Sequence, residues 1–201
     1  MDERSLILES QKGDIDSFNR LVLAYQNIVY SQAYRVMGEP NAADDATQET
    51  FISAFNKIST YRGGSFKAWL LRIVTNACYD ELRRRKRRPT VSLTPQDSQG
   101  EPIESPNWLI DTNETPEETA ERSEIREAIE YCLRNLPEEF REIILLVDLQ
   151  GLDYRETSNV TGKPLGTVKS RLARARERMR ECLFQFGELL TSTYRFVHES
   201  K

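Results

Sequence analysis

Cysteine and histidine are scarce in this chain of 201 residues, which has three cysteines and a single histidine. The cysteines, Cys78, Cys132 and Cys182, are spaced roughly fifty residues apart, without a C-x-x-C pair. Zinc sites and disulfide frameworks are typically built from more closely grouped cysteines and histidines. We therefore expect buried or idle thiols, no metal site and no cofactor.

Long apolar runs are also missing. The opening residues, MDERSLILES, lack the apolar stretch of a signal peptide, and no segment approaches the ~18 apolar residues of a membrane span. The sequence also shows no β-hairpin signals and no alternating strands. These absences predict an all-α, cytoplasmic protein without direct membrane insertion.

Charge is abundant but unevenly distributed. Charged residues make up 30% of the chain and the net charge is only −4. Helical periodicity occupies residues 1–88 and 120–186, whereas residues 89–119 have the polar, proline-containing composition of a linker. Nine acidic side chains and one basic side chain fall between Asp97 and Glu124. We expect two small helical domains joined by a flexible acidic linker and followed by a tail at 187–201.

Apolar spacing defines three helices in the first domain. One helix buries Phe18, Leu21, Val22, Tyr25, Ile28 and Val29. A second follows the Gly38–Pro40 break, with Asn41 as its predicted cap. A third begins after Ser65, another predicted cap, and ends at Pro89. Its inward positions are Phe66, Trp69, Leu70, Ile73, Val74 and Ala77.

Residues 154–178 have the spacing of a helix-turn-helix. Such a unit needs a small residue in the first helix, a glycine in the turn and an apolar residue facing back from the second helix. Ser158, Gly162 and Val168 fall at the expected offsets of four and six residues. Pro164 suits the start of the second helix. The first N–H groups of a helix have no partner within the helix, so the missing N–H of proline costs nothing there.

The second helix of this unit divides into an apolar face and a basic face. The polar and basic positions that would enter a DNA major groove are Thr167, Lys169, Ser170, Arg171, Arg174 and Arg178. Taken alone, the basic face is equally compatible with a solvated helix surface. The turn spacing favours DNA contact.

The third helix of the first domain and the loop before it suggest a second DNA surface. Its candidate residues are Tyr61, Arg62, Ser65, Arg72, Asn76, Tyr79 and Arg83. Aromatic rings beside basic groups can stack on unpaired bases and follow the phosphates of single-stranded DNA. Tyr61 and Tyr79 are the stacking candidates, since Trp69 lies on the apolar stripe and is assigned to the core.

The second helix carries the opposite charge. Its polar face consists of Asp44, Asp45, Gln48 and Glu49, which are neighbours at i, i+4 spacing. This face would repel DNA and suits a protein partner with basic residues. The alternative is a magnesium site of a nuclease, but no lysine or histidine base neighbours these carboxylates in sequence.

Four segments together resemble the extracytoplasmic-function (ECF) sigma factors of the sigma-70 family. They are DDATQETFISAF, YRGGSFKAWLLRIVTNACYDELRRRKR, LPEEFREIILLVDLQGLDYRE and GKPLGTVKSRLARARERM. The resemblance covers both helical domains and assigns 1–88 to sigma region 2 and 120–186 to sigma region 4. It implies a transcription initiation factor that catalyses nothing itself.

The resemblance also implies partners. The acidic helix would bind the β′ subunit of core RNA polymerase, and the β subunit is the other expected partner. The loop and third helix would melt and read the single-stranded −10 element, which implicates Tyr61, Arg62, Ser65 and Asn76. The second helix of the helix-turn-helix, the recognition helix, would read the double-stranded −35 element through Lys169, Ser170, Arg171 and Arg174. The acidic linker would thread toward the polymerase cleft, and an anti-sigma factor, often membrane-bound, would hold the protein inactive.

A conventional helix-turn-helix regulator is the alternative. It would bind a palindromic duplex as a dimer without polymerase, but it explains only the second domain.

Overall fold

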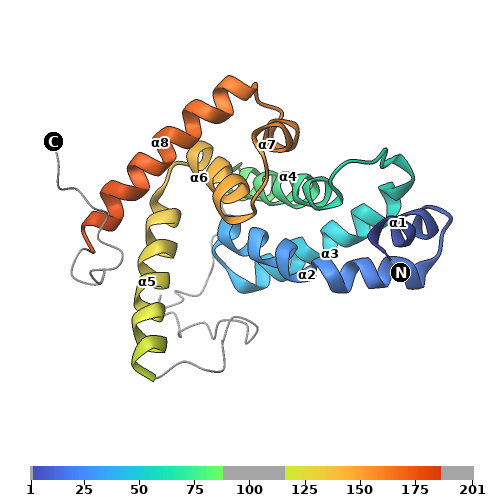
Figure 1. The fold of residues 1–201 in the computed structure, drawn as a ribbon, viewed down its shortest axis with the longest axis horizontal. Coiled ribbons are helices and arrows are strands. Elements are labelled where there is room, and N and C mark those ends of the chain that lie inside the picture. Colours follow the sequence, from blue (N-terminus) through green and yellow to red (C-terminus); the bar gives the residue numbers. More distant parts are fainter. Residues whose placement is uncertain (1, 88–115, 187–201) are drawn as a thin grey trace.

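The computed structural model describes residues 2–87 and 116–186, and every regular element in these two ranges is helical. The N-terminal block contains α1 (Glu3–Gln11), α2 (Ile15–Met37), α3 (Pro40–Lys57), the short η1 (Ile58–Thr60) and α4 (Phe66–Arg87). The C-terminal block contains α5 (Pro116–Asn135), α6 (Glu138–Ile144), the π-helical turn η3 (Leu145–Leu149), α7 (Tyr154–Thr161) and α8 (Leu165–Phe184). The all-α expectation is confirmed (Figure 1).

The three helices predicted for the N-terminal block are present. Helix α2 starts where the Asp14 carboxylate accepts a hydrogen bond from the Ser17 N–H, and ends at Gly38. Gly38 has a φ of 78°, a left-handed conformation that glycine adopts without a steric penalty. The face that α2 turns inward is the predicted one, and its most buried predicted members are Phe18, Leu21 and Val29. The apolar period therefore gave the correct helix and the correct inner face.

Two helix starts differ from the sequence expectation. Helix α3 begins at Pro40 rather than after an Asn41 cap, because proline has the φ of a first helical residue and lacks the N–H that would need a partner. Helix α1 was not predicted at all. The sequence nevertheless contains a signal for α1, because aspartate is a preferred N-cap residue. In the structure the Asp2 carboxylate accepts a hydrogen bond from the Ser5 N–H at 2.8 Å.

The C-terminal block also follows its apolar pattern. Its core contains Leu133, Ile143, Leu145, Leu146 and Val168, all at most 1% exposed. Helix α5 begins at Pro116, a few residues before the expected start. The expected linker and tail lie almost wholly outside the described residues.

The two blocks pack against each other, with α7 beside α4 and α5 beside α2 (Figure 1). The Lys67 ammonium donates a hydrogen bond to the Gln150 carbonyl at 2.5 Å. The Arg35 guanidinium pairs with the Glu130 carboxylate at 3.0 Å, and both side chains are about three-quarters shielded from solvent. These two polar contacts join the C-terminal block to α4 and to α2 of the N-terminal block.

Candidate functional site

The acidic residues of α3 lie on one exposed face. Asp44, Asp45, Gln48 and Glu49 are all exposed. The opposite face carries small buried residues, such as Ala43 and Ala54, which are fully buried. Small side chains let the α3 backbone approach the rest of the block closely, so this helix is firmly held while its carboxylates stay in solvent.

The same face contains Ile52, which the sequence pattern did not single out, and Phe55, which the apolar period assigns to the inner face of the helix. Ile52 is 64% exposed and Phe55 is 36% exposed. Helical spacing places Ile52 one turn after Gln48 and two turns after Asp45. The Phe55 ring also packs against the buried Phe18 ring, 5.0 Å away between centroids, so the inward assignment of Phe55 is only partly correct. For Ile52 the signal was available in the sequence, because this residue continues the polar stripe with an apolar side chain.

The loop that follows η1 is anchored from two sides. The Gln11 amide of α1 donates hydrogen bonds to the carbonyls of Ile58 and Tyr61, at 3.0 and 2.9 Å. The Tyr61 hydroxyl donates to the Gly64 carbonyl at 2.7 Å. The Tyr61 ring lies 5.4 Å from the Trp69 ring, centroid to centroid, and is half-buried. The loop therefore holds one aromatic ring at the surface in a defined position.

Helix α4 starts with the predicted cap, since the Ser65 hydroxyl oxygen accepts a hydrogen bond from the Ala68 N–H at 3.1 Å. Arg72, Asn76 and Arg83 are exposed on this helix. Arg62, in the preceding loop, is exposed as well. These cations and the Asn76 amide are accessible to a nucleic-acid backbone or to unpaired bases.

Tyr79 differs from the expectation, because it is only 6% exposed. The sequence pattern treats α4 as having one buried face, but the C-terminal block covers a second face. Burial raises the pKa of the Tyr79 phenol, and the nearby Glu142 carboxylate adds to this shift. The hydroxyl has no hydrogen-bond partner among the described residues. Tyr79 therefore cannot stack on a base while the two blocks are packed together.

The helix-turn-helix forms as predicted. Helix α7 begins with a capping box: the Asp153 carboxylate accepts from the Glu156 N–H at 2.7 Å, and the Glu156 carboxylate accepts from the Asp153 N–H at 3.0 Å. Gly162 in the turn has a φ of 67°. The Ser158 hydroxyl donates to the Lys163 carbonyl at 2.6 Å, which ties α7 to the turn.

The predicted DNA-contacting face of α8 is partly accessible. Lys169, Ser170, Arg174 and Arg178 are exposed, and Thr167 and Arg171 are half-buried. Two of the arginines make contacts with α6. The Arg171 guanidinium pairs with the Glu139 carboxylate at 2.6 Å, and Arg178 lies over the Phe140 ring at 4.8 Å from its centroid.

Helix α6 presents a row of carboxylates to basic side chains of α4, of the turn before α8 and of α8 itself. Glu138 lies 3.9 Å from the Lys86 ammonium at the end of α4. Glu142 lies 3.7 Å from the Lys163 ammonium in the turn before α8. Burial raises the pKa of the Glu142 carboxyl, and Lys163 opposes that shift. Together with the Glu139–Arg171 pair, these contacts give α6 ion pairs with three basic side chains.

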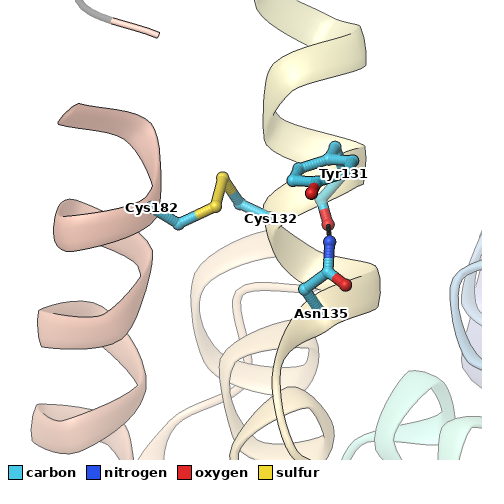
Figure 2. The surroundings of a disulfide bond; sticks show 4 residues. All are labelled: Tyr131, Cys132, Asn135 and Cys182. Atoms are coloured by element: carbon cyan, nitrogen blue, oxygen red, sulfur yellow. Dashed lines mark hydrogen bonds between the residues drawn. A yellow bond between two sulfur atoms is a disulfide. The ribbon is translucent and has the colours of Figure 1, made fainter. Parts of the chain in front are cut away.

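The expectation of idle cysteines is wrong for two of them. Cys132 of α5 and Cys182 of α8 form a disulfide, with their Cα atoms 5.8 Å apart (Figure 2). Cys78 is a buried free thiol, as expected. The sequence spacing missed the pair because residues fifty positions apart meet only when the first and last helices of the block pack together.

Within residues 2–87 and 116–186, no group of three or more acidic, cysteine or histidine side chains is arranged to hold a metal ion. None of the helices in these ranges has both the length and the hydropathy of a membrane span.

Comparison with known proteins assigns both blocks. Residues 21–88 match Sigma-70 region 2, and residues 126–179 match Sigma-70 region 4. The chain is 39% identical over 167 residues to the ECF RNA polymerase sigma factor SigE of Mycolicibacterium smegmatis, covering 83% of this chain and 62% of that relative. It is 36% identical over 183 residues to the RNA polymerase sigma-H factor of Pseudomonas aeruginosa, covering 90% of this chain and 93% of that relative.

Solved structures show the same fold. The sigma factor RpoE of Bartonella quintana, crystallised with the anti-sigma factor NepR, superposes with a TM-score of 0.65 at 24% identity, over 85% of this chain and 98% of that chain. CnrH, in complex with the cytosolic domain of CnrY, gives a TM-score of 0.64 at 24% identity, over 91% of this chain and 97% of that chain.

The two matched regions and the helix-turn-helix formed by α7 and α8 define a transcription initiation factor of the sigma type. The chain belongs to the ECF sigma factors of the sigma-70 family. It directs RNA polymerase to promoters, and the conventional dimeric regulator is not favoured.

Proposed function

We propose that the chain binds core RNA polymerase through the exposed face of α3 and holds promoter DNA through α4 and α8. The observation that carries this proposal is the separation of opposite charges onto the exposed faces of different helices. An acidic face lies on α3, and basic faces lie on α4 and α8. A single DNA-binding surface would not need the acidic face.

The polymerase-docking face consists of Asp44, Asp45, Gln48 and Glu49, extended by the exposed apolar pair Ile52 and Phe55. Carboxylates followed along the helix by apolar side chains fit a partner helix with basic and apolar residues, as in the β′ subunit that the resemblance implies. The charges would steer the encounter, and the apolar pair would add buried area at the C-terminal end of the face.

The −10 surface consists of the loop after η1 and the exposed side of α4. Arg62, Arg72, Asn76 and Arg83 are accessible, and the Tyr61 ring is fixed beside them. Tyr79 joins this surface only after the C-terminal block moves away from α4. The Tyr79 hydroxyl has no hydrogen-bond partner among the described residues, so the separation breaks no hydrogen bond of this group with them.

The −35 surface is the exposed face of α8. Lys169, Ser170 and Arg174 lie in the first half of the helix, where a recognition helix meets base edges. Arg178 follows one turn later and suits a phosphate contact. Thr167 and Arg171 border this face and complete the predicted set.

The domain limits and further partners complete the proposal. Residues 1–88 form sigma region 2, residues 120–186 form sigma region 4, and 89–119 connect them, with a tail at 187–201. The protein acts in the cytoplasm without catalysing a reaction. An anti-sigma factor that covers the α3 and α8 faces would keep it inactive.

Transcription in vitro tests this function. Core polymerase with this protein, on a library of promoter fragments, should give new transcripts that share −35 and −10 sequences at one fixed spacing. Tight duplex binding by the protein alone, with no transcripts, would instead support a dimeric regulator.

A charge-reversal pair tests the docking face. Asp44→Lys with Asp45→Lys should abolish holoenzyme formation while the helical circular dichroism is unchanged. The matched control is Asp16→Lys with Glu127→Lys, which makes the same charge change at exposed positions of α2 and α5. Equal loss of polymerase binding in both variants would show that net charge, rather than the α3 face, determines binding.

A further inference from the structure

The disulfide closes the C-terminal block covalently. It joins α5, the first helix of the block, to the last turns of α8 (Figure 2). The elements α6, η3 and α7 all lie within the loop that it closes. The two cysteines are 50 residues apart in sequence. A cross-link over a loop of this length removes much of the conformational freedom of the unfolded block.

Such a bond is unexpected in a protein that acts beside polymerase. Cytoplasmic thiol systems keep most protein cysteines reduced, and disulfides found there are usually transient, catalytic or redox-sensing. The argument rests on the proposed function, because the site of action places the bond in that compartment. The Cys132–Cys182 disulfide, placed in a reducing compartment, is therefore a candidate for reversible thiol–disulfide exchange.

Access to the two sulfurs is unequal. Cys182 is partly exposed near the end of α8, whereas Cys132 is only 1% exposed. An incoming thiolate would therefore attack the sulfur of Cys182, and the sulfur of Cys132 would leave. The remaining cysteine, Cys78, is fully buried in the other block and does not compete for this exchange.

The position of the bond links it to the recognition helix. The buried residues of α8, such as Leu172 and Ala175, pack against the block core, whereas its last turns lie against α5. Besides the disulfide, the ring pair Tyr131–Phe186, at 5.6 Å between centroids, joins α5 to the segment just after α8. Without the covalent link, α5 is held to α8 by side-chain packing.

We propose that Cys132 and Cys182 form a thiol–disulfide exchange site for low-molecular-weight thiols and disulfides, and that its state sets the stability of the block that holds the recognition helix. Oxidation transfers two electrons from the dithiol to a disulfide RSSR, which forms the protein disulfide and two RSH molecules. Reduction is the reverse reaction and passes through a mixed disulfide between R and Cys182.

A redox titration of the full chain tests the exchange. The protein is equilibrated with mixtures of reduced and oxidised glutathione, then quenched, unfolded and alkylated, and its thiols are counted by mass. The wild type should change between one and three free thiols within the range of mixtures used. Cys78→Ser should keep a two-thiol change, and Cys132→Ser should lose it. A wild-type thiol count that is the same in every mixture would overturn the proposal.

The single variants test which sulfur is attacked. Cys132→Ser leaves Cys182 free, and this thiol should form a mixed disulfide with oxidised glutathione. Cys182→Ser leaves the buried Cys132, which should react at least about tenfold more slowly because buried thiols are poorly accessible. Faster reaction at Cys132 would refute the assigned direction of attack.

Stability and transcription test the consequence. Reduction should lower the unfolding midpoint of the C-terminal block by about 10 °C or more. Reduction should also lower −35-dependent transcription when the sigma factor is limiting. The double variant Cys132→Ser with Cys182→Ser should behave like the reduced wild type in both oxidising and reducing buffer. Equal melting and equal transcription in both states would refute the stability claim.

The failure of this inference is distinguishable from the failure of the proposed function. If neither redox form gives transcripts with core polymerase, the proposed function is wrong whatever the titration shows. If transcripts appear and the thiol count does not respond to glutathione, only the exchange site is wrong.

Discussion

The ion pair between Arg171 and Glu139 gives a quantitative prediction for DNA binding. Arg171 belongs to the proposed −35 surface, but its guanidinium lies 2.6 Å from the Glu139 carboxylate of α6. To contact DNA, the guanidinium must either break its ion pair with Glu139 or contact the DNA and the carboxylate at the same time. Glu139→Gln removes the competing charge and keeps the shape of the side chain. We therefore expect tighter binding to the −35 duplex.

The size of the effect follows from the exposure of the pair. The Arg171 and Glu139 side chains are 24% and 49% exposed, so solvent screens their attraction. Partly exposed pairs are worth ~0.2–1 kcal/mol, which corresponds to about a 1.4- to 5-fold gain in affinity when the competition is removed. Arg171→Ala should have the opposite effect and cost ~1–3 kcal/mol.

Competition binding of labelled −35 duplex to the holoenzyme measures both effects. The gain from Glu139→Gln should shrink at higher salt and vanish when Arg171 is alanine. Glu9→Gln is the matched control, because Glu9 forms a similar exposed pair with Lys12 at 2.9 Å in the N-terminal block. An unchanged affinity for Glu139→Gln, or an equal gain without Arg171, would refute the reasoning.

Three further predictions concern the fold. Leu172→Ala, at a position 2% exposed, should lower the unfolding free energy of the C-terminal block by ~2–5 kcal/mol in urea, and a loss under ~1 kcal/mol would contradict its core assignment. Asp153→Ala removes the capping box of α7 and should cost ~1 kcal/mol in the same assay, whereas Asp153→Asn should retain most of the stability. Burial raises the pKa of the Cys78 thiol to about 12, so at pH ~8 the neutral thiol dominates and maleimide labelling should require unfolding. Rapid labelling of Cys78 in the folded protein would show that the site opens readily.

The helices and the faces they bury were predictable because they depend on neighbouring residues. Phe18, Leu21 and Val29 are buried together since a helical period places them on one side of α2. The helix-turn-helix was predictable for the same reason: Gly162 and Val168 act through local backbone conformation and local packing. Helix α1 was missed although its Asp2 cap is a local signal.

The opposite charges of α3 and α8 could also be read directly from the sequence. Asp44 and Asp45 are exposed because the other face of α3 is built from small buried residues. Lys169 and Arg174 are exposed because α8 has its own apolar stripe. A helix with one apolar face must turn its charges to solvent, so each exposed face was fixed without knowledge of the neighbouring helix.

Only the tertiary structure decided which distant side chains meet. The apolar period places Cys132 on the buried stripe of α5, but it does not show that Cys182 of α8 lies opposite it. Likewise, Tyr79 is buried because the C-terminal block covers a second side of α4, and Arg171 is paired because α6 passes beside it. Helix formation is governed by interactions within a few residues, whereas these contacts depend on how complete surfaces pack, so no local pattern could specify them.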